Sequence, residues 1–543
     1  MTDTPSRTWK TASGIPLKSS YCREDIPQWY LPEINRAPGE LPYQRGAFAQ
    51  GYRSKPWRIF QLSGFGKPED ENERIKFLLA HGETGFLMEH DRNTADHMYN
   101  VDHPDVLARP QDVGLTGAVM QSIRDIDICL SDLPIATTFG HAGGAVVQHA
   151  PFALAGYWTV AKRRGLNLET LPGTGQSDFF LTYHGCVPKH QIPTAAGLRF
   201  NADIIEFCYK YVKRWVPVSI AAYNGADTGL NAYQELGALF ANAVEYLDEI
   251  KRRGSMPLEA AAKACGGVNF RLSMDLFEEA SKIRAGRKMW ADLLERRYGI
   301  TDAKARQLRI HCVTSGSNMT YQQPLNNIVR GTLMALAGVL SGIQSLGISG
   351  YDEALSIPSE HAHQMSVRIQ QILQHETNVP AVVDPLGGSY YVETLTAELI
   401  ERAWSFFDEI QSRGGFLETL NTGWLHHCAH ENQHEDFLAQ ERRERIIVGV
   451  NEFKADISPF EVDGFVGVND AFDVAMDRLK DVRATRAQRP ATQALHNLER
   501  VCRSSENIMP AMMDALDAEV TLGEVGDVWR SVLGDWVAPQ ITI

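Results

Sequence analysis

Two stretches, "RIHCVTSG" (residues 309–316) and "GIQSLGIS" (residues 342–349), each have the length of a β-strand, and the residues between them are enough for a helix. Six earlier stretches share this character: "IFQLSGF" from Ile59, "TGFLMEHD" from Thr84, "IATTFGHA" from Ile135, "TGQSDFF" from Thr174, "VSIAAYN" from Val218 and "GGVNFRLS" from Gly266. Eight strand–helix units in series predict an α/β fold, the (β/α)8 TIM barrel.

Helix-like segments lie between these strands. "DIIEFCYKYVKRW" (residues 203–215) and "MDLFEEASKIRAGRKMWADLLERRYG" (residues 274–299) carry apolar residues three and four apart, with good helix formers between them. Residues 1–55 are rich in Pro, Gly, Tyr and charge and show no sustained period. We therefore expect an extended N-terminal arm that makes subunit contacts (1–55), a barrel (56–400) and a helical C-terminal extension (401–543).

Several predicted strands are unusually polar for a barrel. "TTFGHAGG", "GTGQSD" and "VTSGSN" are full of Thr, Ser and Gly, whereas barrel interiors are normally packed with branched aliphatic side chains. Small side chains there would leave room along the axis for an elongated ligand. The alternative is that these residues belong to loops beside the strands.

Composition and charge exclude several classes of function. The net charge of −14 argues against a nucleic-acid-binding surface and against docking to anionic membranes. No run of 18 apolar residues predicts a membrane span, and the N-terminus lacks the apolar core of a signal peptide. Eight cysteines without a CxxC pair suit reduced thiols, so we expect a cytoplasmic protein.

Several strings together resemble the large subunits of adenosylcobalamin-dependent acyl-CoA mutases, the methylmalonyl-CoA mutase family. "KPWRIFQLSGFG" resembles the family's junction of arm and first strand, and "GTGQSD" resembles its GTIQND motif. "TSGSNMTYQQPLNNIVRG", "GIQSLGISGYDEALSIPSE" and "VVDPLGGSYYVETLT" match its late barrel, and "RIIVGVNEF" and "SENIMPAMMDAL" match the segments after the barrel. The resemblance runs from about Thr11 to about Asp535.

This resemblance implies a reaction, a cofactor and a partner. In the family the acyl-CoA threads along the barrel axis and adenosylcobalamin covers one barrel mouth. An adenosyl radical abstracts hydrogen from the substrate, and the thioester carbonyl group migrates to the neighbouring carbon. The cobalt ligand of the family lies in a DxHxxG motif, which is absent from these 543 residues. We therefore expect no metal ligand here and a small cobalamin-binding subunit as partner, in a heterotetramer of two large and two small subunits.

Two positions implied by the resemblance suggest the substrate. Leu62 stands where the methylmalonyl enzyme has a Tyr, and Glu89 stands where most members have a small Ala. The 2-hydroxyisobutyryl-CoA mutase branch has Ile and Asp at these two positions. Leu62 with Glu89 is similar, so we expect the carboxylate to accept a hydrogen bond from a substrate hydroxyl. The alternative is that Glu89 pairs with a neighbouring cation such as Arg92.

Other carried-over positions also depart from the methylmalonyl enzyme. Its carboxylate-binding Arg aligns with Cys186 or Val187, so methylmalonyl-CoA is not the expected substrate. Tyr223 is kept, but the family's thioester-binding His becomes Asn224, which can donate a hydrogen bond but cannot exchange a proton. The resemblance assigns catalytic roles to four residues: Tyr223, Asn224, Glu89 and Gln176.

The resemblance assigns the remaining site residues to substrate or cofactor. The substrate group consists of Leu62, Glu89, Thr138, Thr174, Gln176, Cys186 and Asn224. The cofactor group consists of His90, Asp227 and Gln344. An Arg that helps to hold the CoA tail in the family aligns near Cys265, so these tail contacts must be partly rebuilt.

The histidine-rich segment "HHCAHENQH" (residues 426–434) suggests a metal site, because His427, His430 and His434 have helical spacing. The family has a charged surface helix at this position, so we expect a solvated helix face instead. His141, His149, His184 and His190 could suggest a metal-dependent barrel hydrolase, but they lack its HxH motif. Two alternatives stay open: a mutase of non-hydroxylated branched acyl-CoAs, and a paralogue that has lost the chemistry.

Overall fold

A computed structural model describes residues 9–144, 146–185, 187–455, 465 and 467–540. Eight short strands lie in this part of the chain and form two four-stranded sheets in which every pair is parallel. One sheet has the order β1 (Arg58–Ile59), β8 (Ser345–Gly347), β7 (Arg309–Thr314) and β6 (Gly267–Leu272). The other has the order β2 (Gly85–Leu87), β3 (Phe139–His141), β4 (Gly173–Thr174) and β5 (Trp215–Val216). The predicted α/β fold with parallel strands is therefore confirmed.

The two sheets are not joined into one closed sheet in the described residues, unlike the barrel predicted from the sequence. Between β1 and β2, two backbone N–H groups bond to side-chain oxygens and not to the backbone carbonyls of a neighbouring strand. The Ile59 N–H donates to the Thr84 hydroxyl (3.0 Å) and the Gln61 N–H donates to the Glu83 carboxylate. Between β5 and β6, Pro217 ends the strand because it has no N–H to donate. Beyond it, Ile220 forms an isolated parallel bridge with Val268.

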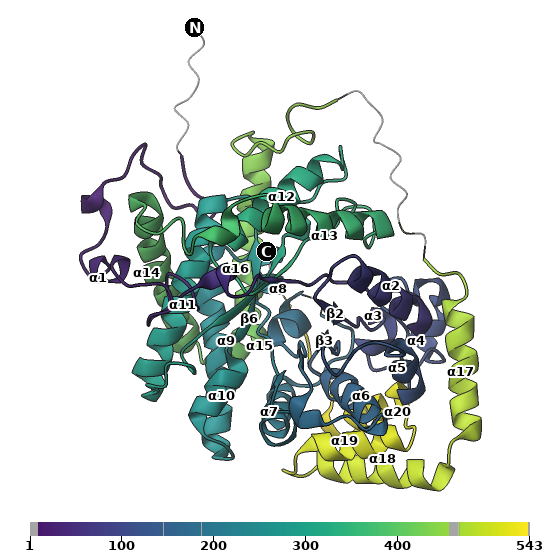
Figure 1. Cartoon of the computed structure of the whole chain (residues 1–543). Coiled ribbons are helices and arrows are strands. Elements are labelled where there is room, and N and C mark those ends of the chain that lie inside the picture. The colour runs from purple at the N-terminus through teal and green to yellow at the C-terminus, as the bar shows by residue number, and fades with distance from the viewer. Residues whose placement is uncertain (1–8, 145, 186, 456–464, 466, 541–543) are drawn as a thin grey trace.

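Helices connect successive strands (Figure 1). The quoted segment 274–299 is confirmed as α11 (Leu276–Tyr298), whereas the segment 203–215 is helical only up to the end of α7 (Thr194–Tyr211), and Trp215 begins β5. Asp275 caps the start of α11 by accepting from the Glu278 N–H (3.3 Å), and Gly299 ends it at a φ of 66°. The other helices up to α13 are α1 (Leu31–Ile34), α2 (Pro68–Ala80), α3 (Arg92–Ala95), α4 (Pro104–Leu107), α5 (Ile123–Cys129), α6 (Ala150–Arg163), α8 (Ala222–Asp227), α9 (Ala232–Arg253), α10 (Leu258–Cys265), α12 (Asn326–Leu340) and α13 (Glu360–His375).

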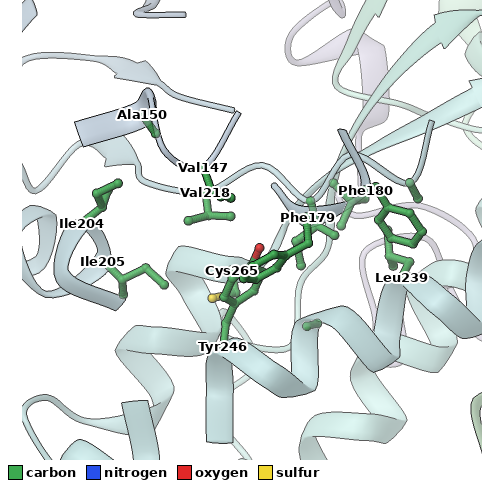
Figure 2. Packing of buried hydrophobic residues seen from close by; sticks show 14 of the residues in the cluster. Val147, Ala150, Phe179, Phe180, Ile204, Ile205, Val218, Leu239, Tyr246 and Cys265 are labelled. Atoms are coloured by element: carbon green, nitrogen blue, oxygen red, sulfur yellow. The ribbon is translucent and has the colours of Figure 1, made fainter. Parts of the chain in front are cut away.

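The N-terminal residues run along the outside of the helices. Tyr30 donates to Glu393 (3.1 Å) and Tyr43 donates to the Ala303 carbonyl (2.9 Å). The hydrophobic core lies between the sheets and the helices, where Phe179 and Tyr246 stack with ring centroids 5.5 Å apart (Figure 2). Cys265, which aligns near the family's tail-binding Arg, is fully buried in this core.

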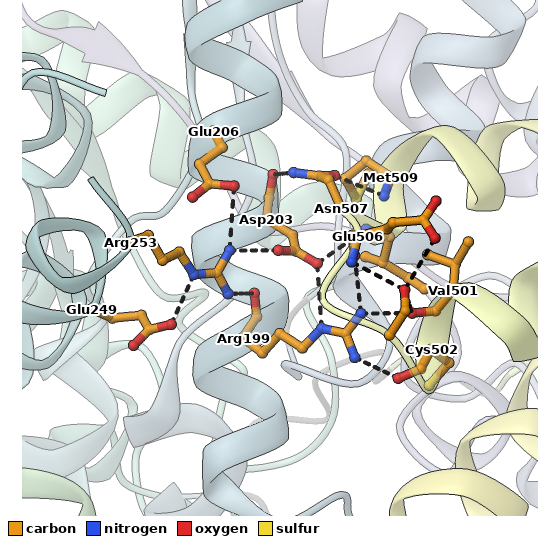
Figure 3. A network of polar contacts seen from close by, with 12 residues as sticks. Arg199, Asp203, Glu206, Glu249, Arg253, Val501, Cys502, Glu506, Asn507 and Met509 are labelled. Atoms are coloured by element: carbon orange, nitrogen blue, oxygen red, sulfur yellow. Dashed lines mark hydrogen bonds and ion pairs between the residues drawn. The ribbon is translucent and has the colours of Figure 1, made fainter. Parts of the chain in front are cut away.

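The described part of the C-terminal region is helical. It contains α14 (Tyr390–Ser412), α15 (Phe416–Asn421), α16 (Trp424–Glu441), α17 (Ala471–Thr485), α18 (Gln488–Cys502), α19 (Ile508–Asp517) and α20 (Leu522–Leu533). A polar network docks its last helices on α7, which the same network links to α9 (Figure 3). Arg253 binds Asp203 (2.6 Å), and Arg199 donates to the Val501 carbonyl (2.8 Å). None of the helices in the described ranges is long and apolar enough to cross a membrane.

Candidate functional site

A cavity of about 900 Å³ lies between the two sheets and opens toward both ends of the strands. Its middle is lined by polar and aromatic side chains from both sheets: Phe60, His141, Thr174, Asn269, His311 and Ser345. Thr174 lies in "GTGQSD", one of the small polar stretches for which we predicted space along the axis, and Ser345 adds another small polar side chain. The polar strands therefore face a cavity that can hold an elongated ligand.

Two histidines in the cavity wall stay neutral near pH 7. Burial lowers the pKa of His141 to about 3 and that of His311 to about 4. The Gly143 N–H donates to His141 Nδ1 (3.0 Å), so the proton of the neutral ring is on Nε2. His311 Nδ1 lies 2.8 Å from the Ser345 hydroxyl. These rings offer hydrogen bonds to a ligand without adding charge.

The amino-terminal ends of the strands form a positively charged mouth, which comprises Lys55, Arg58, Arg214 and Arg309. Burial and the neighbouring Arg58 lower the pKa of Arg309, so a bound anion there would be stabilising. Sequence analysis missed this group because its members lie far apart in the chain. Gln344 lies at the same mouth, where its amide accepts from the Ile310 N–H and donates to the Gly342 carbonyl (both 2.8 Å).

Leu62 and Glu89 lie near the carboxyl ends of β1 and β2 and both line the cavity. The Leu62 side chain is 60% exposed. Burial raises the pKa of Glu89 to about 7, and the positive charge of Arg92 offsets part of this increase. The Arg92 guanidinium forms an ion pair with Asp96 (2.7 Å). Within the described part of the chain, the Glu89 carboxylate makes no ion pair within 4.0 Å. The cavity therefore contains a carboxylate that can accept a hydrogen bond from a ligand.

The short helix α8 follows β5 and presents Tyr223, Asn224 and Asp227. Tyr223 and Asp227 are four residues apart, and the Tyr223 hydroxyl donates to Asp227 (3.2 Å). Asp227 also accepts from Ser317 (2.9 Å) and Ser315. Asn224 lines the cavity, and its Oδ1 has no hydrogen-bond partner among the described residues. Asn224 therefore lies in the cavity wall with a buried amide oxygen that is unpaired within the described chain.

A second acid, which sequence analysis missed, lies near this helix. Glu353 lines the cavity, and burial raises its pKa to about 7, with smaller contributions from Asp352 and Asp227. Gln176, which follows β4, also lines the cavity. The carboxyl ends of the strands therefore carry an acidic, hydrogen-bonding surface.

Four residues predicted for the site do not line the cavity or lie outside the described chain, and Asp227 is one of them. His90 is buried beside His149, with ring centroids 4.5 Å apart, and does not line the cavity. Side chains alternate along a strand, so Leu87 and Glu89 face the cavity while His90 faces away. Thr138 also does not line the cavity, whereas Phe139 and His141 do. Cys186 lies outside the described residues.

The histidine-rich segment lies on α16. His426 is buried and its Nε2 lies 2.6 Å from the Tyr183 carbonyl, whereas His427 is exposed and contacts Glu431 (3.2 Å). No group of three or more His, Cys, Asp or Glu side chains among the described residues could hold a metal ion. The segment is therefore a helix with one buried and several outer histidines.

Comparison with known proteins gives the family. The Methylmalonyl-CoA mutase family model matches residues 10–535. The 2-hydroxyisobutanoyl-CoA mutase large subunit of Aquincola tertiaricarbonis is 32% identical over 97% of this chain and 92% of that protein. The methylmalonyl-CoA mutase of Rhizobium meliloti is 33% identical over 98% of this chain but 74% of that protein, and the human mitochondrial enzyme is 30% identical over 97% and 69%. The chain belongs to the methylmalonyl-CoA mutase family and is an isomerase.

Proposed function

We propose that this chain is the large subunit of an adenosylcobalamin-dependent mutase that isomerises a branched, hydroxylated acyl-CoA. The reaction is a 1,2-migration of the thioester carbonyl group. The observation that carries the proposal is Glu89, a carboxylate without an ion-pair partner in the described chain, which lines the same cavity as the exposed Leu62.

The cavity suits an elongated acyl-CoA. Its positively charged mouth at Lys55, Arg58, Arg214 and Arg309 would bind the phosphates of the CoA tail, because guanidinium groups form strong charge-assisted bonds with phosphate. The polar middle would accommodate the pantetheine amides, and the acyl group would reach the carboxyl ends of the strands. Gln344 lies at the tail end of this path, so we propose a role near the CoA tail as an alternative to its predicted role near the adenosyl group.

Hydroxyl recognition follows from the chemistry of Glu89. When ionised, its oxygens accept a hydrogen bond from a substrate hydroxyl, and a substrate without that hydroxyl leaves the carboxylate unpaired. The unmet bond costs about 1–3 kcal/mol, which corresponds to roughly 5- to 150-fold in selectivity. Methylmalonyl-CoA would instead place a second carboxylate near Glu89, and repulsion between the two charges disfavours it.

Four residues would orient the reacting group. The Asn224 amide would donate to the thioester oxygen, while Thr174 and Gln176 would hold the substrate between the sheets. Tyr223, fixed by its bond to Asp227, would cover the reacting carbons and keep water away. Asn224 cannot exchange a proton, so its contribution is a fixed dipole directed at the oxygen.

Adenosylcobalamin would cover the carboxyl ends of the strands, where Glu353 in the cavity wall offers an acceptor to its polar groups and Asp227 holds Tyr223 in place. When bound, it supplies the adenosyl radical that abstracts hydrogen from the substrate. We propose that a small subunit brings the cobalt ligand, in a tetramer of two large and two small subunits. This is supported by the "large subunit" name of the Aquincola relative, 92% of which this chain covers.

We propose that the two sheets are halves of a (β/α)8 barrel. Their strands follow one another in sequence order, and the Thr84 N–H donates to the Ile59 carbonyl (3.1 Å) across one seam. Residues 56–400 would form this barrel, residues 1–55 the arm and residues 401–543 the helical extension. Reduced thiols suit a cytoplasmic location.

Reconstitution tests the proposal. The chain, a small cobalamin-binding subunit and adenosylcobalamin are incubated with 2-hydroxyisobutyryl-, 3-hydroxybutyryl-, isobutyryl-, pivalyl- and methylmalonyl-CoA, and products are separated by mass-resolved chromatography. We expect turnover of the hydroxylated compounds only. Turnover of isobutyryl- or pivalyl-CoA at the same rate would show a mutase of plain branched substrates. No turnover, with cofactor demonstrably bound, would favour a paralogue that has lost the chemistry.

A further inference from the structure

A chain of three groups reaches the backbone of Leu62. Arg74 on α2 lies 2.8 Å from Nδ1 of His363 on α13, and Nε2 of His363 lies 3.0 Å from the Leu62 carbonyl oxygen. Both side chains are buried, and both line the cavity. The Leu62 segment and the following helix α2 therefore meet α13, whose His363 is 301 residues away from Leu62 in the sequence.

The chemistry of Arg74 fixes the direction of both hydrogen bonds. A guanidinium can only donate, so Nδ1 of His363 must accept from Arg74. The neutral ring then carries its proton on Nε2, which donates to the Leu62 carbonyl. Burial and the nearby Arg74 lower the pKa of His363 to about 3, so the ring keeps this state across the range of ordinary assays.

The Leu62 segment needs such support. The strand β1 ends at Ile59, so the residues after it have few ladder bonds, and the Leu62 side chain projects into open space. Arg74 also lies over the Phe65 ring, 4.9 Å from its centroid. A Cβ added to Gly64 would lie only 2.4 Å from the Glu89 Cβ, so a shift of this segment would displace Glu89 as well.

We propose that Arg74 and His363 are positioning residues that fix the Leu62 segment and thereby the acyl selectivity of the cavity. This inference rests on the proposed function and deepens it, because it names what holds the residues that discriminate the acyl group. Neither residue needs to touch the substrate. They act through the Leu62 carbonyl and, by way of Gly64, through Glu89.

Two kinds of variant test this proposal. His363→Leu removes both the acceptor and the donor, whereas the amide of His363→Gln can accept from Arg74 and donate to Leu62. Arg74→Met breaks the chain at its other end and keeps the test open if His363→Leu does not fold. His426→Gln is the matched control, because His426 is also buried and contacts a single backbone carbonyl, but it does not line the cavity.

Hydrogen exchange provides a readout that needs no substrate. We expect the peptide that contains Gln61–Phe65 to exchange at least tenfold faster in His363→Leu and Arg74→Met, and at the wild-type rate in His363→Gln and His426→Gln. Unchanged exchange in the first two variants would overturn the proposal.

Binding then tests selectivity. Calorimetry gives the ratio of Kd values for isobutyryl-CoA and 2-hydroxyisobutyryl-CoA, and we expect this ratio to fall about tenfold in His363→Leu and to recover in His363→Gln. In a Leu62→Gly background, the effect of His363→Leu should shrink, since both act through one segment. An undiminished effect there would overturn the mechanism. A wild-type chain that binds neither acyl-CoA would overturn the proposed function and this selectivity role with it, while the exchange data still report on the contact itself.

Discussion

Replacing Glu89 with Gln should stabilise the chain while it weakens substrate discrimination. Burial raises the pKa of Glu89 from 4.5 to about 7. Each pKa unit corresponds to about 1.4 kcal/mol, so holding the ionised carboxylate in the wall costs at most about 3 kcal/mol. Gln has nearly the same shape and no charge, so Glu89→Gln removes this cost.

The sign of the pH dependence follows from linkage. Between pH 4.5 and 7 the folded wild-type chain binds more protons at Glu89 than the unfolded chain does, so the contribution of Glu89 to stability falls as pH rises. The stability advantage of Glu89→Gln over wild type should therefore be small below pH 4.5, increase through pH 7 and level off above it. The contributions of the other titrating groups to the pH dependence of stability are the same in both proteins, so they cancel in the difference.

Denaturant unfolding of both proteins in steps from pH 5 to pH 8 measures this advantage. Glu259→Gln, on the exposed face of α10, provides a control with the same change of charge. A constant difference between wild type and Glu89→Gln across this range would refute the reasoning, because Glu89 would then not be strained when ionised. Saturating 2-hydroxyisobutyryl-CoA should reverse the order and stabilise wild type more than Glu89→Gln.

Three further predictions concern other parts of the site. Arg309→Met should weaken binding of every acyl-CoA about tenfold and reduce its salt dependence, as measured by calorimetry; a loss that depends on the acyl group would contradict a tail contact. Asn224→Ala should lower kcat about 10- to 100-fold with little change in KM, and a change in KM alone would contradict transition-state stabilisation by the amide. After dialysis against a chelator, elemental analysis should find no zinc bound to the histidines of α16, and the triple variant His427→Ala, His430→Ala, His434→Ala should retain wild-type turnover; zinc retained in equal molar amount would contradict the assignment of these residues to an ordinary helix.

The order of strands and helices was predictable because each unit carries a local pattern. The strand near Arg309 and the long α11 follow from apolar spacing, and so does the direction of the parallel sheets. Closure of the sheet was not predictable in the same way. It depends on single side chains at two seams, such as the carboxylate of Glu83 and the missing N–H of Pro217, which interrupt the backbone ladder.

The sequence was most informative about site residues whose position depends on a single strand. Glu89 and Leu62 line the cavity, but the alternation of side chains turns His90 away. The positively charged mouth could not be predicted from spacing, because Arg58, Arg214 and Arg309 are brought together only when parallel strands align their starts. His363 likewise lies about three hundred residues from Leu62, and only the fold joins them.

The most direct test of the central claim is a crystal structure of this chain with 2-hydroxyisobutyryl-CoA. We predict that the substrate hydroxyl lies within hydrogen-bonding distance of a Glu89 carboxylate oxygen, about 2.5–3.0 Å. The CoA phosphates should lie at the mouth formed by Arg58 and Arg309. A hydroxyl that points away from Glu89, or an acyl-CoA bound outside the cavity, would contradict this account.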